Sequence, residues 1–178
     1  MDTVQPVVEM NEWMWNRFIE DMKDVAPEEA AWRPLPQANT IDVIVRHLRI
    51  EAQWHVACLE RGERMPTEAT PSLQQEIDAV PLDFERNLKE LDELYTRFNA
   101  ALRSTTLAAL EQRTTLAYGS PPGAPRPAHF LGFHQVLHLA GHWGQIRTLR
   151  TLYRKTRGEP VPAKFYPGNV SYPKPVDG

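Results

Sequence analysis

The chain has 178 residues, a formal net charge of -3 at pH 7 and a pI near 6.1. This length suits one domain with a sizeable core, and the lack of excess positive charge disfavours nucleic-acid binding. No apolar run approaches the roughly 18 residues of a membrane span, and the first residues lack the features of a signal peptide. With a single cysteine, Cys58, these features predict a cytoplasmic protein without an internal disulfide.

Three segments in the first part of the chain have helical periodicity, and none has the alternation of a strand. The first expected helix covers about 4–24. The second covers about 40–61, with Thr40 as a plausible N-cap residue and Gly62 as its stop. The third, about 81–104, has apolar residues at alternating spacings of four and three, namely Phe84, Leu88, Leu91, Tyr95, Phe98 and Leu102.

A fourth helix is expected over about 128–156, after a proline-rich stretch at 118–127 that we interpret as a loop. Four such helices predict an all-α protein, a four-helix bundle over residues 1–157. Residues 158–178 hold five prolines and are expected to form an extended tail. A basic cluster before this tail suits a helix C-terminus and comprises Arg150, Arg154, Lys155 and Arg157.

Histidines in the fourth helix carry the strongest functional signal. His138 and His142 are four residues apart, so their Cβ atoms should lie about 5 to 6 Å apart on one face. His134 extends this row by one turn. The row could form a polar helix edge, but its surroundings are apolar, and an unpaired buried polar group costs about 1 to 3 kcal/mol. Gly141 and Gly144 each cost about 1 kcal/mol within a helix, which indicates close approach of a neighbouring helix or a ligand.

A third ligand can come from His47 on the second expected helix. Together, His47, His138 and His142 would form a three-imidazole site suited to zinc, nickel, iron or copper, with a position left for water or substrate. The alternative is that His134 and His138 form the ligand pair. The sequence therefore predicts a metal centre between the second and fourth helices.

Helix geometry argues against three other candidate ligands. His55 and Cys58 lie about 12 and 16 Å along the helix axis from His47, too far to share one ion with it. We therefore expect His55 to be a core residue and Cys58 a small buried hydrophobe. His129 lies too far from His142 for the same reason.

A general base is not evident in the histidine helix. A helix of the HExxH type carries glutamate after its first histidine, but Leu139 follows His138. Neither Gln135 nor Gln145 can take up a proton. Glu51, one turn after His47, is the acidic candidate for a catalytic role, with an exposed helix-flank glutamate as the alternative.

Two stretches together resemble the DinB/YfiT-like family. Residues 39–48 read Asn-Thr-Ile-Asp-Val-Ile-Val-Arg-His-Leu and are similar to the opening of that family's second helix. Residues 134–146 contain His-x-x-x-His-x-x-x-His followed by Trp-Gly-Gln-Ile, like the family's fourth-helix signature. With Ala-Trp-Arg-Pro at 31–34, the likeness covers roughly 8–156. Trp143 departs from the usual basic residue at its position.

The resemblance implies a four-helix bundle, often dimeric, with a nickel or zinc site. Carried over by position, the ligands are His47, His138 and His142, and we assign His134 and Gln145 to places beside them. Some similar proteins are thiol-dependent S-transferases or isomerases that use mycothiol, bacillithiol or glutathione. A metal-held thiolate would supply the nucleophile without a helix-borne base.

Three functions follow as expectations. The first is a metal-dependent enzyme that activates a low-molecular-weight thiol toward a small-molecule substrate. The others are a metal-dependent hydrolase that uses bound water and a non-catalytic metal-binding stress-response protein. Trp13 and Trp15 point about 200° apart on a helix, so one should face outward, and with the resemblance this favours a homodimer.

Overall fold

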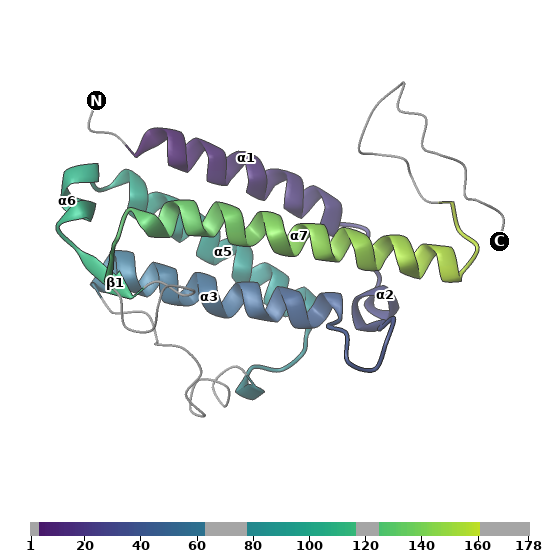
Figure 1. The fold of residues 1–178 in the computed structure, drawn as a ribbon. Helices are drawn as coiled ribbons and strands as arrows, with labels where there is room; N and C mark the ends of the chain where they lie inside the picture. Colours follow the sequence, from purple (N-terminus) through teal and green to yellow (C-terminus); the bar gives the residue numbers. More distant parts are fainter. Residues whose placement is uncertain (1–3, 63–77, 117–124, 161–178) are drawn as a thin grey trace, which may run out of the picture.

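The structure, a computed structural model, describes residues 4–62, 78–116 and 125–160. Within them, four long helices form a bundle, which confirms the predicted all-α class (Figure 1). Their bounds lie within a few residues of the predicted ones: α1 (Gln5–Met22), α3 (Ile41–Arg61), α5 (Phe84–Arg103) and α7 (Phe130–Thr156). No helix of the described residues is both long and apolar enough to cross a membrane.

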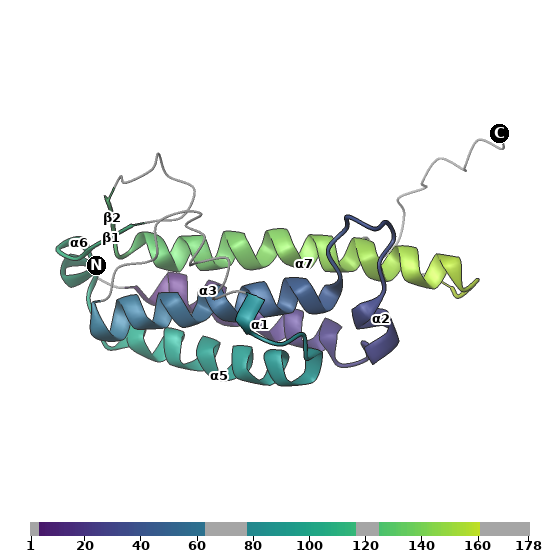
Figure 2. The same ribbon diagram turned by 90° about the horizontal axis from the view of Figure 1, so that it is seen from below.

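The four helices form a closed ring in which α1 contacts α7, α7 contacts α3, α3 contacts α5, and α5 contacts α1. Helices α3 and α5 run in the same direction, since Arg49 pairs with Glu90 and Glu60 with Arg97 further along both (Figures 1 and 2). A parallel pair of neighbours needs a connection that returns along the bundle, and residues 62–83 separate the two helices in the sequence. Helices α3 and α7 run antiparallel, which sets the register of the histidines described below.

Capping residues fix the ends of the two central helices. Thr40 caps α3 because its Oγ1 accepts a hydrogen bond from the Val43 amide at 3.1 Å. Gly62 ends that helix with φ of 68°, a left-handed conformation that favours glycine. Helix α5 begins later than predicted because Asp83 is its N-cap and accepts from the Arg86 amide at 3.0 Å.

The core lies between the four long helices. The last four of the six apolar residues predicted in α5 are buried there, and Phe84 and Leu88 are partly buried against it. Large side chains less than 2% exposed are Phe18, Met22, Ile41, Leu48, Leu91, Tyr95, Phe98, Leu102, Leu131, Leu139 and Ile146. Helices α1 and α7 approach closely at Gly132, where an added Cβ would lie 2.6 Å from Val7 Cγ1. Asn11 Nδ2 also donates to the Gly132 carbonyl there at 3.3 Å.

Of the two explanations expected for Gly141 and Gly144, a neighbouring helix is not found among the described residues, and a ligand stays a prediction. Apart from the backbone of α7 itself, no described atom lies within 4 Å of a Cβ placed at either glycine, and both residues are exposed. Phe133 and Leu137, in the stretch expected to be internal, are also 53% and 71% exposed. This face of α7 therefore has no partner among the described residues.

The prediction missed several short elements: α2 (Pro27–Ala31), α6 (Leu107–Glu111), β1 (Thr114–Leu116) and β2 (Pro125–Pro127). The two strands pair antiparallel, with Thr114 opposite Pro127. The last three residues of the expected loop are therefore a strand, since proline is tolerated at sheet edges. The rest of that loop and the tail beyond residue 160 lie outside the described residues. The proposed domain division at 157/158 stays a prediction.

Candidate metal centre

Antiparallel packing of α3 and α7 brings together three imidazoles, one from the first third of α3 and two from the first half of α7. His138 Nε2 lies 3.0 Å from His47 Nε2 and 2.9 Å from His142 Nε2. One nitrogen from each ring falls within 4.8 Å of the others, a spacing that allows all three to bind one metal ion. The structure thus brings together the three residues predicted as ligands.

The protonation states of these imidazoles suit metal binding. Burial, partly offset by the nearby Glu51 carboxylate, lowers the pKa of His138 to about 3. Burial also lowers the pKa of His47. Both rings are therefore neutral at neutral pH and offer a lone pair. Because the His47 side chain is still 30% exposed, small molecules can reach the cluster. Three imidazole nitrogens with an accessible side fit zinc, nickel, iron or copper.

Glu51 is only 1% exposed, so the alternative of a helix-flank surface glutamate is wrong. Its Oε2 lies 3.0 Å from His138 Nδ1, and its Oε1 lies 3.7 Å from His47 Nε2. Burial raises the pKa of Glu51, but His134, His138 and His47 outweigh that effect and lower the pKa to about 2. A carboxylate beside the outer nitrogen of a metal-binding histidine fixes its tautomer and orientation. The position of Glu51 therefore suits orientation of His138.

His134 lies on the inner side of the cluster. Its Nε2 is 3.6 Å from Glu51 Oε2, and it forms a second potential metal-binding group with Glu51 and His138. His138 therefore belongs to two potential groups, and the second contains the alternative pair His134 and His138 together with Glu51, which was not predicted as a ligand. One group combines it with His47 and His142, and the other combines it with Glu51 and His134.

Two glutamines hold histidine rings of this region. Gln145 Oε1 lies 2.9 Å from His142 Nδ1, so an Nδ1–H there leaves Nε2 free to face the other imidazoles. Gln135 Oε1 contacts His55 Nδ1. His55 is fully buried, as expected for a core residue, and burial lowers its pKa to about 4. Sequence reasoning missed that His55 also faces Glu51 and His134, although it lies one turn after Glu51 on the same face of α3.

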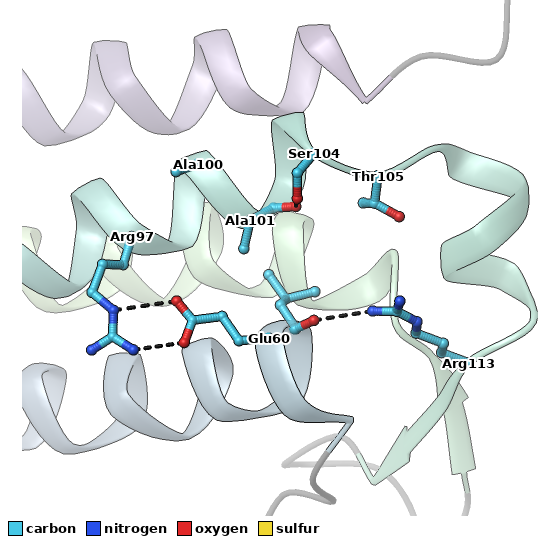
Figure 3. A pocket seen from close by; sticks show the side chains of 8 residues that line it. Glu60, Arg97, Ala100, Ala101, Ser104, Thr105 and Arg113 are labelled. Atoms are coloured by element: carbon cyan, nitrogen blue, oxygen red, sulfur yellow. Dashed lines mark hydrogen bonds and ion pairs between the residues drawn. The ribbon is translucent and has the colours of Figure 1, made fainter.

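Other candidates lie outside the centre. Cys58 is buried, as expected, and His129 lines an apolar cavity of about 700 Å³ between α1, α6 and α7. Neither belongs to a potential metal-binding group of the described residues. Figure 3 shows another hollow, at the C-terminal ends of α3 and α5, where Glu60 pairs with Arg97 at 2.6 Å. Arg113 there donates to the Leu59 carbonyl at 3.0 Å.

Comparison with known proteins gives one result. The family model of the DinB superfamily matches residues 10–146. This range includes all of α3 and the part of α7 that ends at Ile146. No curated protein and no solved structure matches the chain significantly. The family match covers most of the chain and spans all three clustered imidazoles. The chain therefore belongs to the DinB superfamily.

Proposed function

We propose that this protein is a metal-dependent enzyme that activates a low-molecular-weight thiol toward an electrophilic small molecule, as an S-transferase or isomerase. The observation that carries the proposal is the convergence of three imidazole Nε2 atoms from α3 and α7. A divalent cation held there would lower the pKa of an incoming thiol and favour its thiolate. Nickel and zinc are the metals we favour.

Five residues of the chain would bind the ion or orient its ligands. His47, His138 and His142 would hold the ion, while Glu51 and Gln145 orient two of these rings through their Nδ1 atoms. Leu139, which occupies the place of the glutamate in an HExxH helix, is fully buried. A thiol nucleophile that arrives with the cosubstrate needs no base at this position of α7.

Cobalt substitution tests this proposal. A thiol that binds through sulfur should produce a sulfur-to-cobalt charge-transfer band, and we would try mycothiol, bacillithiol and glutathione. Cys58→Ser should leave the band and turnover nearly unchanged, because Cys58 is buried away from the cluster. His47→Ala should abolish both. Absence of a band with all three thiols would contradict the proposal.

A metal-dependent hydrolase is the second candidate, and the position of Glu51 favours it. Its carboxylate lies 3.7 Å from His47 Nε2 and could move a proton to or from a bound water. Hydrolysis of a simple ester without thiol, abolished in both His47→Ala and Glu51→Gln, would select this function. If neither thiol nor ester reacts while metal remains bound, a non-catalytic metal-binding role replaces both enzyme functions.

A further inference from the structure

Beside the three-imidazole group, around Glu51, the bundle contains buried polar atoms that lack hydrogen-bond partners. Nε2 of His55 has no hydrogen-bond partner among the described atoms, and the Glu51 carboxylate is approached only by imidazole nitrogens, with His138 Nδ1 at 3.0 Å and His134 Nε2 at 3.6 Å from Oε2. The exposed fractions of Glu51 and His55 are 1% and 0%. An unsatisfied polar group at such burial costs about 1 to 3 kcal/mol, and more when charged. Their grouping therefore calls for a missing partner.

The partner of Glu51 must be positively charged or a donor, because a carboxylate offers only acceptor atoms. Gln135 Oε1 contacts Nδ1 of His55, which places the proton of a neutral ring there and leaves Nε2 with a lone pair. A neutral imidazole can donate one hydrogen bond to the Glu51 carboxylate, as the distance of 3.0 Å between His138 Nδ1 and Oε2 allows, but it does not balance the charge of the carboxylate. A cation would balance that charge.

We propose that Glu51, His134 and the Nδ1 atom of His138 form a second cation position inside the bundle, linked to the outer one through His138. Their ligand atoms lie within 4.8 Å of one another, with His134 Nε2 and His138 Nδ1 at 3.6 and 3.0 Å from Glu51 Oε2. Two nitrogens and one carboxylate oxygen suit a first-row divalent metal such as zinc or copper better than calcium or magnesium, which prefer oxygen ligands. The inference deepens the proposed function, since the outer centre also uses His138.

Sharing of His138 has a chemical consequence. When its Nε2 binds the outer ion, a neutral ring carries its proton on Nδ1. An ion at the inner position takes the Nδ1 lone pair, so that proton leaves to solvent and the ring becomes an imidazolate. The inner ion then faces two negative ligands, Glu51 and the His138 imidazolate, which balance its double charge.

Zinc stoichiometry tests the inner position on the full chain without a histidine tag. Equilibrium dialysis and elemental analysis should give two zinc ions per wild-type chain, and one each for His134→Gln and His142→Gln. His129 is the N-cap residue of α7 and lies outside both groups, so His129→Gln should keep two zinc ions. One zinc per wild-type chain, unaffected by His134→Gln, overturns the inner position.

The same variants separate failure of the two centres. If wild type binds one ion that His142→Gln loses and His134→Gln keeps, the outer centre stands and the inner position is rejected. If His134→Gln loses the ion and His142→Gln keeps it, the inner position stands and the three-imidazole centre of the proposed function fails. Circular dichroism of each zinc-free variant checks that it folds.

Copper tests the bridge itself. Two Cu²⁺ ions joined through one imidazolate are magnetically coupled, so the second equivalent should reduce the electron paramagnetic resonance signal of the first. His134→Gln should instead give the signal of one isolated ion. Two independent signals that simply add in wild type would overturn the sharing of His138.

Discussion

The two halves of α7 differ in whether the buried polar groups around them have hydrogen-bond or ion-pair partners. In the first half, His134 and His138 face α3, where the buried Glu51 carboxylate is approached only by imidazole nitrogens and Nε2 of His55 has no hydrogen-bond partner among the described atoms. In the second half, Arg147 and Arg150 form ion pairs with acidic residues of α1 and α2. Evolution of a stable bundle alone would favour the second pattern in both halves, so the unpaired half points to a ligand.

In the paired half, Trp143, which departs from the usual basic residue at its position, has a hydrogen-bond partner on α1. Trp143 Nε1 donates to Asp21 Oδ2 at 2.8 Å, and Arg147 Nε donates to the same oxygen at 2.5 Å. One turn later, Arg150 pairs with Asp24 and Glu29, each at 2.8 Å. Arg150, one residue of the basic cluster predicted as a helix-end feature, therefore also joins a network that ties α7 to α1 and α2.

The largest expected effect on stability is in the paired half. Arg150→Ala should destabilise the protein by about 3 to 5 kcal/mol, because Glu29, with a side chain only 5% exposed, would lose its buried partner. Urea denaturation measures this change, and bound metal should stay at the wild-type level. Arg157→Ala, which removes an exposed pair with Glu159, is the matched control and should change little. Metal loss in Arg150→Ala would contradict the separation of the two halves.

The unpaired half should make the metal-free protein sensitive to acid through His55. Its pKa falls from 6.5 to about 4 on folding, mainly by burial, while Glu51, His134 and Gln135 face the ring. Below pH 6.5 the unfolded chain takes up a proton that the folded one refuses, so stability is lost as pH falls from 6.5 toward 4.

The loss through this one group is on the order of 3 kcal/mol at the lower end. Denaturation curves of the metal-free protein between pH 4 and 7.5 measure it, and His55→Gln should show a shallower dependence. An equal slope in wild type and variant would show that His55 does not carry the effect.

Two buried carboxylates, one in each region, give a matched comparison. Glu51→Gln should weaken zinc binding at the outer centre about 10- to 100-fold, as expected for loss of a group that orients a ligand. Glu29→Gln should leave zinc affinity unchanged, because Glu29 pairs with Arg150 and lies in the other region. Competition with a chromophoric chelator measures both affinities. Equal affinities of wild type and Glu51→Gln would remove the orienting role of Glu51.

The smallest expected effect on stability concerns the exposed face of α7. We propose that a second copy covers this face, because Leu137 and Trp13 of α1 are 71% and 51% exposed, and because Gly141 has open space above it. Leu137→Glu should change the stability of the chain by less than about 0.5 kcal/mol but convert a dimer to a monomer. Light scattering decides, and a wild-type monomer at all concentrations would contradict the proposal.

The fold was largely predictable because its helices carry strong local signals. The four-three spacing of α5, the Thr40 cap and the Gly62 stop act within a few residues. The parallel course of α3 and α5 was not predictable, because periodicity contains no direction. The strand at Pro125–Pro127 also escaped, since three residues with two prolines carry no alternation.

The ligand candidates were predictable for a similar local reason, whereas their surroundings were not. The spacing of His138 and His142 places both on one face in any helix. The contacts of Glu51 and His55 depend on the register between α3 and α7, which only packing sets. Trp13 and Trp15 also combine a predictable and an unpredictable part. Helix geometry predicted that one of them faces outward, but only the packing of α1 determines that Trp15 is the buried one.

Metal content of protein purified without a histidine tag tests the metal centre most directly. His138 belongs to both potential metal-binding groups, so His138→Ala should lose nearly all bound nickel or zinc in elemental analysis. Arg147→Ala, two turns further along the same helix in the paired half, should keep the wild-type content. Full metal occupancy in folded His138→Ala, or wild-type protein that binds neither metal when supplied, would contradict a metal centre between α3 and α7.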